Sequence, residues 1–119
     1  MANQKPTMTE SQIQAEILRA IGSRSDVRLF RNQVGCVESD GRWIRYGLTP
    51  GSADLIGWQS VTVTNEMVGR KLAVFTSIEV KGQHGRLTPE QDNWRRVVSS
   101  AGGAAGVARS VAEAAGILI

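Results

Sequence analysis

The sequence is poor in the residues that build zinc sites and disulfide frameworks. It contains 1 cysteine, Cys36, and 1 histidine, His84, among 119 residues. A lone cysteine cannot form an internal disulfide, and one cysteine with one histidine cannot supply the ligands of a structural zinc site. Any metal ion must therefore be bound by carboxylate oxygens, which favour hard divalent cations.

The sequence also lacks long hydrophobic runs. No uninterrupted apolar stretch approaches the roughly 18 residues that indicate a membrane-spanning helix. The N-terminal residues, MANQKPTMTE, lack the basic and then apolar layout of a secretory signal peptide. We therefore expect a cytoplasmic protein that does not associate with a membrane.

The sequence has only a small excess of positive over negative charge. The 14 Lys and Arg residues outnumber 11 Asp and Glu residues, which gives a formal net charge of +3. This balance permits a polyanionic partner without requiring one. A chain of 119 residues, of which 41% are hydrophobic, has the size of one globular domain. We expect a flexible tail over residues 1–8, which are polar and aperiodic, and the domain over residues 9–119.

Capping residues, prolines and glycines delimit three predicted helices. Thr9 with Gln12, and Thr88 with Gln91, have the spacing of a capping box, in which two side chains satisfy the first backbone groups of a helix. The predicted helices begin after Thr9, Thr88 and Ser110 and end at Gly22, at Gly102-Gly103 and at Gly116, respectively.

Runs of β-forming residues predict five strands, over residues 27–34, 42–46, 54–63, 72–81 and 106–109. The segment 65–71 looks like a hairpin connection between two of them. Helices that alternate with strands in this way predict an α/β fold in which helices pack on a mixed sheet.

The strand over residues 72–81 carries an acid-x-lysine pattern. Side chains two positions apart share one face of a strand, so Glu79 and Lys81 should project together, roughly 7 Å apart along it. Ile78 and Val80 should then point into the core. An exposed strand face with this pattern is also typical of a solvated pair of charges without a function, and that interpretation stays open at this point.

A second acid, Asp54, opens the strand over residues 54–63. If the two strands are neighbours, Asp54 and Glu79 can hold a hard cation such as Mg²⁺ or Mn²⁺ beside Lys81. A divalent cation, carboxylates and a lysine suit the hydrolysis of a phosphodiester, because the transition state gains negative charge.

Four motifs in order carry a resemblance to a known family. They are Gly51-Ser52-Ala53-Asp54-Leu55-Ile56, Ile78-Glu79-Val80-Lys81, Gly85-Arg86-Leu87-Thr88, and the pair Gln91 and Trp94. Together they resemble the VRR-NUC (virus-type replication-repair nuclease) family of the PD-(D/E)XK nuclease superfamily, from about Thr9 to Ser110. The resemblance implies a restriction-endonuclease-like αβββαβ core, with a mixed sheet flanked by helices.

The same resemblance implies an activity and partners. It implies a metal-dependent endonuclease that cleaves DNA, often branched or Holliday-junction DNA, in phage or bacterial replication and repair. It further implies a homodimer that works in the bacterial cytoplasm, or in the host cytoplasm if a phage encodes it.

The resemblance also implies roles for individual residues. Asp54 and Glu79 match the acids that bind Mg²⁺ or Mn²⁺, and Lys81 matches the catalytic lysine. The backbone carbonyl of Val80 would complete the protein's share of the metal ligands. Glu16 matches an acidic residue on the first helix that reaches the metal directly or through water.

Two of these assignments have structural alternatives. Gln91 matches a position that places the phosphate or the catalytic lysine, but its spacing from Thr88 is explained equally well by a capping box. Glu16 can instead pair with Arg19 or Arg24 on the helix surface.

Arginines with interleaved aromatic residues surround the two early strands, and such a strip can bind the DNA backbone. The arginines that we expect to contact DNA are Arg31, Arg42, Arg45 and Arg86. A solvated sheet face is the alternative. A second alternative concerns the whole chain: a DNA-binding or scaffold protein of the same fold without catalysis, although Asp54, Glu79 and Lys81 are all present.

Overall fold

The computed structural model describes residues 7–119, which form two compact units. The first unit ends at Gln59 and the second begins at Ser60. Most of the tail predicted over residues 1–8 lies outside the described residues, and the prediction of one domain over 9–119 stays a prediction. None of the helices within residues 7–119 has the length and apolar character needed to cross a bilayer.

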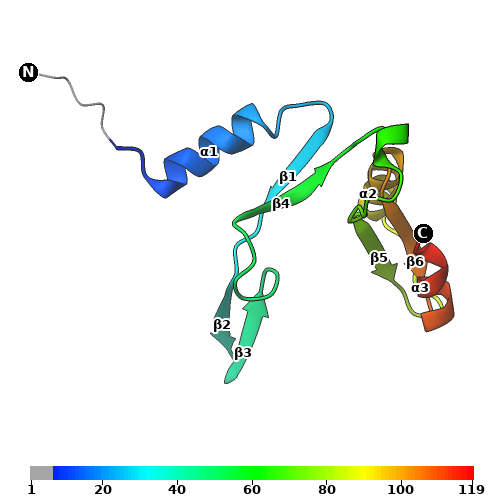
Figure 1. The fold of residues 1–119 in the computed structure, drawn as a ribbon. Coiled ribbons are helices and arrows are strands. Elements are labelled where there is room, and N and C mark those ends of the chain that lie inside the picture. The colour runs from blue at the N-terminus through cyan, green and yellow to red at the C-terminus, as the bar shows by residue number, and fades with distance from the viewer. Residues whose placement is uncertain (1–6) are drawn as a thin grey trace, which may run out of the picture. The chain divides into compact units, whose positions relative to one another are not determined.

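Within the described residues, three α-helices accompany strands paired in three two-stranded sheets, two antiparallel and one parallel. This mixed α/β composition confirms the predicted fold class. Figure 1 shows the pairs β1 with β4, β2 with β3 and β5 with β6.

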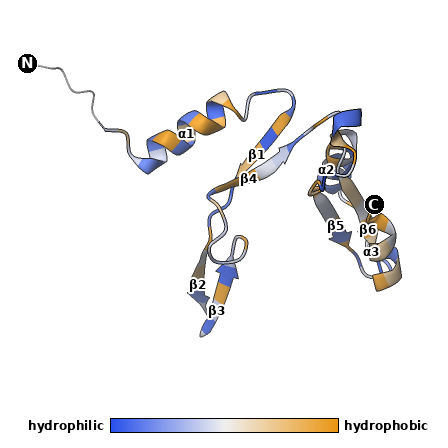
Figure 2. Ribbon diagram, in the orientation of Figure 1, coloured by the Kyte–Doolittle hydropathy of each residue, from blue (hydrophilic) through white to orange (hydrophobic). Residues whose placement is uncertain are grey.

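The first helix, α1, spans Glu10–Ala20 and begins with the predicted capping box. The backbone N–H of Gln12 donates to the hydroxyl of Thr9 at 3.2 Å, and the Gln12 side-chain oxygen accepts from the Thr9 backbone at 2.9 Å. Apolar residues recur along the helix and appear as orange bands in Figure 2. The cap was predictable because it depends only on residues that are close in sequence.

Strands β1 (Val27–Arg31) and β4 (Leu55–Gln59) pair antiparallel, and the pairing places Arg31 opposite Leu55. The rings of Phe30 and Trp58 lie 5.6 Å apart across this pair. At the other end, Asp26 accepts hydrogen bonds from Arg24 and Gln59. The bond from Arg24 is the main reason why the pKa of the Asp26 carboxyl is lowered from its ordinary value.

The hairpin of β2 (Gly35–Ser39) and β3 (Arg42–Tyr46) corrects the sequence analysis, which predicted β3 but no strand at β2. The residues Asp40 and Gly41 connect the strands with φ values of 50° and 75°. Positive φ at both positions is the mark of a two-residue hairpin turn, which matches the twist of the strands. Asp-Gly is a typical sequence for such a turn, but Gly35 and the polar Ser39 do not have the β-forming character that would indicate a strand before it.

The second unit contains a strand-helix-strand arrangement. Strand β5 (Thr76–Val80) pairs parallel with β6 (Ala104–Ala108), and the helix α2 (Pro89–Ser100) connects them. The short helix α3 (Val111–Ile117) follows β6 (Figure 1). Buried residues of α2 and β6 form the core of this unit: Val98, Ala104 and Ala108.

The predicted hairpin connection over residues 65–71 is wrong. This segment contains the short 3₁₀ helix η1 (Asn65–Met67), while β4 pairs with β1 and β5 pairs with β6. The strands that flank the segment are also shorter than predicted, since β4 ends at Gln59 and β5 begins at Thr76. Pairing partners are a tertiary property, and two successive β-forming runs do not reveal them.

The predicted core face of β5 is also wrong. Ile78 is 39% exposed and Val80 is 75% exposed, whereas Ser77, Glu79 and Lys81 are half-buried. The reason is that α2 covers the polar face of the strand: the indole N–H of Trp94 donates to the Ser77 hydroxyl at 2.7 Å. The polar residues of β5 are thereby held against a helix.

Candidate active site

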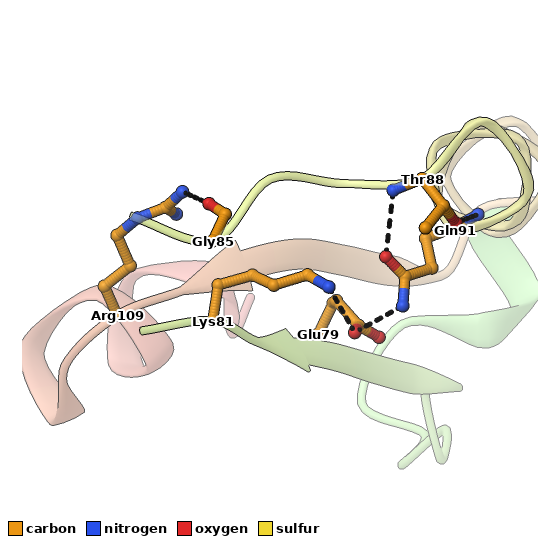
Figure 3. A network of polar contacts seen from close by, with 6 residues as sticks. All are labelled: Glu79, Lys81, Gly85, Thr88, Gln91 and Arg109. Atoms are coloured by element: carbon orange, nitrogen blue, oxygen red, sulfur yellow. Dashed lines mark hydrogen bonds and ion pairs between the residues drawn. The ribbon is translucent and has the colours of Figure 1, made fainter. Parts of the chain in front are cut away.

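Glu79 and Lys81 form an ion pair on one face of β5, as their spacing predicts. The Lys81 ammonium lies 3.5 Å from Oε1 of Glu79 (Figure 3). The Lys81 side chain is only 18% exposed, whereas that of Glu79 is 40% exposed. The lysine is therefore held in place along its length, and the carboxylate remains open to solvent.

Gln91, at the start of α2, connects the helix to this ion pair. Its side-chain nitrogen donates to Oε1 of Glu79 at 2.9 Å. The same side chain accepts from the Thr88 backbone at 3.0 Å, while the Gln91 N–H donates to the Thr88 hydroxyl at 3.2 Å. The capping box and the contact with the acid thus exist together, because the amide oxygen serves one and the amide nitrogen the other.

The loop after β5 holds the stem of Lys81. The Lys81 backbone N–H donates to the carbonyl of Ala108 at 3.1 Å, and the N–H of Gly85 donates to the carbonyl of Gly82 at 3.2 Å. The guanidinium of Arg109 donates to the carbonyl of Gly85 (Figure 3). A side-chain Cβ at Gly85 would lie 3.3 Å from Cδ of Lys81, so this glycine allows the loop to approach the lysine closely.

A cavity of about 410 Å³ lies beside the cluster, between α2 and the strands β5 and β6. Its lining includes Glu79, Gln91, Trp94 and Arg95. Arg95 forms an ion pair with Asp92 at 2.8 Å, and this hydrogen bond is the main cause of the lowered pKa of the Asp92 carboxyl. The cavity has a size within the range of roughly 300–1,000 Å³ that is typical of ligand pockets.

Asp54 belongs to the first unit, where it immediately precedes β4. It is exposed, and its backbone carbonyl accepts from the N–H of Asn32 at 2.8 Å. With Glu10 and Gln14 of α1, Asp54 lines a cavity of about 210 Å³. Two carboxylates therefore border one cavity in this unit.

Asn32 holds the loop that presents Asp54, although no motif in the sequence includes it. Its buried side chain donates to the Ser52 hydroxyl at 2.7 Å and to the Ala53 carbonyl at 2.9 Å, and it accepts from the Leu48 N–H at 3.0 Å. Asn32 lies within the strand predicted over residues 27–34, which ends at Arg31 in the structure, and nothing in the sequence distinguished it from other polar residues of a strand. Its role depends on partners that are 16 to 21 positions away.

Replacing Asn32 with aspartate should destabilise the first unit by about 1–3 kcal/mol, the usual cost of leaving a buried polar group unpaired. The aspartate can still accept from the Leu48 N–H, but it turns an oxygen toward the carbonyl of Ala53. Urea unfolding measures the loss, and Gln33→Ala at the exposed neighbouring position is the control. An unchanged unfolding midpoint for Asn32→Asp would contradict this role.

Glu16 does not line the cavity at Asp54. It lies 3.9 Å from Arg19 in an exposed ion pair, which is the alternative that the sequence left open. Glu10 and Gln14 occupy the cavity-lining face of α1, together with Ile13, because residues three and four apart share a side of a helix. The signal that could have identified Glu10 was its helical spacing from Ile13.

The four arginines expected to bind DNA have different surroundings. Arg31 donates to Oε1 of Gln14 at 2.6 Å, so it lies next to the cavity at Asp54. Arg86 is exposed in the loop before α2, and Arg42 and Arg45 are exposed on β3.

Neither unit, within residues 7–119, brings together three His, Cys, Asp or Glu side chains as a complete metal site would require. Glu79, Lys81 and Val80, whose backbone carbonyl is an expected metal ligand, lie in the second unit. Asp54 and Glu16 lie in the first. The donors that each unit offers are hard oxygens. The two contacts to Glu79 both use Oε1, so its other oxygen is available to a cation.

The comparison with family models decides the family. The model described as the VRR-NUC domain matches residues 8–112, nearly the whole chain. The chain belongs to the VRR-NUC domain family. No curated protein and no solved structure matched the chain. The VRR-NUC match spans the motifs at Asp54 and at Glu79-x-Lys81, and it makes the chain a member of a nuclease family.

Proposed function

We propose that this VRR-NUC domain is a metal-dependent endonuclease that hydrolyses phosphodiester bonds in DNA. The observation that carries the proposal is the cluster of Glu79, Lys81 and Gln91, in which a carboxylate, an ammonium group and an amide meet beside a cavity. In a nuclease family, this cluster is the natural place for the scissile phosphate.

Mg²⁺ or Mn²⁺ fits the donors of this chain. We propose Asp54 and Glu79 as its acidic ligands and the carbonyl of Val80 as a further ligand. Glu10 is the acid of α1 that lines a cavity with Asp54, and Glu16 remains the alternative on that helix. A bound divalent cation would supply a water of lowered pKa and would offset charge on the phosphoryl group.

Different side chains of the protein then have different roles in binding and cleavage. Lys81 places a fixed positive charge where the attacking water and the phosphoryl oxygens meet, and its low exposure keeps that charge in position. Gln91 is a positioning residue, since it orients Glu79 through one hydrogen bond. Arg31 of the first unit and Arg86 of the second bind backbone phosphates of the DNA. Arg42 and Arg45 belong to the β2–β3 hairpin.

We further propose that the enzyme acts as a homodimer and prefers branched DNA, such as a Holliday junction, in phage or bacterial replication and repair. The support for this is the motif resemblance to short VRR-NUC nucleases. Such a substrate presents paired strands that two copies of one active site can cut.

The test is a cleavage assay on end-labelled four-way junction, flap, nicked and linear duplex DNA. Purified protein should cut the branched substrates with Mg²⁺ or Mn²⁺, and EDTA should abolish cutting. Asp54→Asn should abolish cleavage and leave DNA binding in EDTA unchanged. Binding without cleavage of any substrate in either metal would favour the scaffold alternative and overturn the proposal.

A further inference from the structure

The β2–β3 hairpin exposes apolar and aromatic side chains on a sheet of only two strands. Trp43 is 70% exposed, and Val37 and Ile44 are about half exposed. Within residues 7–119, neither outer edge of the hairpin pairs with another strand. An isolated two-stranded hairpin is at best marginally stable in water, so this element gains from a further strand.

The register of the hairpin shows which backbone groups are open at the edge of β3. Ser39 pairs with Arg42 across the two-residue turn, and the pair that flanks such a turn is hydrogen bonded. Hydrogen-bonded and non-hydrogen-bonded pairs alternate along antiparallel strands. The backbone groups of Trp43 and Arg45 therefore point away from β2, toward the open edge.

We propose that β3 pairs antiparallel with β3 of a second copy, about a two-fold axis at Ile44, to form a four-stranded sheet. This inference rests on the proposed function because it assumes the homodimer. What it adds is the surface through which the two copies bind each other. An isologous contact requires a strand to be complementary to itself when reversed. The sequence Arg-Trp-Ile-Arg-Tyr of β3 meets this requirement.

The axis at Ile44 satisfies both the backbone and the side chains. The outward groups of Trp43 and Arg45 face those of Arg45 and Trp43 in the second copy, so the hydrogen-bonding pattern matches. Each arginine then lies opposite an aromatic ring, since Arg42 also faces Tyr46 of the second copy. Cation–π contacts of this kind stabilise a pair, and like charges do not meet.

Other symmetric registers are poorer. An axis at Arg45 would set the two Arg45 side chains against each other, which is destabilising. An axis at Trp43 would set Arg45 opposite the turn residue Gly41 and lose a pair at the end. Pairing of β2 with β2 of the second copy would place Cys36 of one copy opposite Glu38 of the other. This pair has neither opposite charges nor an aromatic ring.

A second copy suits this hairpin better than DNA does. Its two arginines are balanced by two acids, Glu38 and Asp40, so the hairpin carries no net charge. A surface that binds DNA gains its affinity from an excess of positive charge against phosphates. Self-pairing uses both the charge and the aromatic residues.

The first experiment compares proline at the two outer edges. Arg45→Pro removes an outward N–H of β3 and leaves the hydrogen bonds to β2 in place, since proline is tolerated where the N–H faces outward. Cys36→Pro is the matched control at the cross-strand partner, on the edge of β2. Light scattering should give a dimer mass for the wild type and for Cys36→Pro, and a monomer mass for Arg45→Pro.

The second experiment places a cysteine on the proposed axis. In a Cys36→Ser background, which has no other cysteine, Ile44→Cys should form a disulfide-linked dimer on mild oxidation. Non-hydrogen-bonded antiparallel pairs have Cα atoms about 4.5 Å apart, within the disulfide range of roughly 4.4–6.8 Å. Val37→Cys, at the cross-strand partner of Ile44, should not cross-link.

The possible outcomes distinguish a failure of the β3–β3 interface from a failure of the proposed nuclease activity. A monomeric wild type would overturn the homodimer and this interface together, while leaving the cleavage assay to judge the nuclease. A dimer that survives Arg45→Pro and does not cross-link through Ile44→Cys would overturn the interface alone. Lower DNA affinity of Arg45→Pro at unchanged mass would assign the hairpin to DNA and also overturn the interface.

Discussion

Replacing Lys81 with methionine should lower the rate of DNA cleavage by about 10²–10³-fold, the usual effect of removing one preorganised stabilising group. The methionine keeps an apolar stem beside Gly85, so the loop after β5 retains its packing. It removes the ammonium that lies 3.5 Å from Glu79. Single-turnover cleavage of a labelled four-way junction measures the loss.

The control is Lys71→Met, which removes one positive charge from an exposed lysine outside the cluster. It should cleave at the wild-type rate. A general effect of charge on binding would lower the activity of both variants equally. Wild-type cleavage by Lys81→Met would remove Lys81 from the catalytic machinery.

The features predicted correctly from the sequence are those set by neighbours along the chain. Both capping boxes form as expected, at Thr9 with Gln12 and at Thr88 with Gln91, since their partners are three residues apart. The proximity of Glu79 to Lys81 follows from the alternation of side chains along a strand. The motifs themselves were sufficient to indicate the family.

The features that the sequence did not reveal depend on distant partners. The polar side chains of β5 face α2, because Trp94 and Gln91 donate to residues of the strand. A period-two pattern shows that a strand has two faces, but it does not show which face a helix will cover. Asn32 is another example, since its importance comes from a loop about twenty positions later.

Gln91 makes both a local contact, with Thr88 in the capping box, and a contact with a distant residue, Glu79. Its substitution by glutamate separates the effects of these two contacts. Glutamate at the third position of a helix also completes a capping box with threonine, so the start of α2 should keep its stability. The substitution replaces the N–H donor to Glu79, now at 2.9 Å, with a second carboxylate oxygen. Two carboxylates at this distance repel each other unless one of them is protonated.

Gln91→Glu should therefore keep the helix cap but lose about 1 kcal/mol of stability with the hydrogen bond to Glu79. It should cleave about 10–100-fold more slowly, as expected when the support of a metal ligand is lost. Because the substitution alters the surroundings of Glu79, a proposed metal ligand, the Mg²⁺ concentration that gives half-maximal cleavage should also change. A purely structural role for Gln91 would leave that concentration unchanged. Measuring the rate over a range of Mg²⁺ concentrations thus distinguishes the two roles.

Gln12→Glu provides the matched control, because Gln12 has the same position in the capping box of α1. It should change neither stability nor the Mg²⁺ requirement. Gln91→Ala loses both contacts and should lose about 2 kcal/mol of stability along with activity, because each hydrogen bond contributes roughly 1 kcal/mol. If Gln91→Glu cleaves like the wild type at every Mg²⁺ concentration, the hydrogen bond to Glu79 has no part in positioning that carboxylate, and the role of Gln91 is to cap the helix.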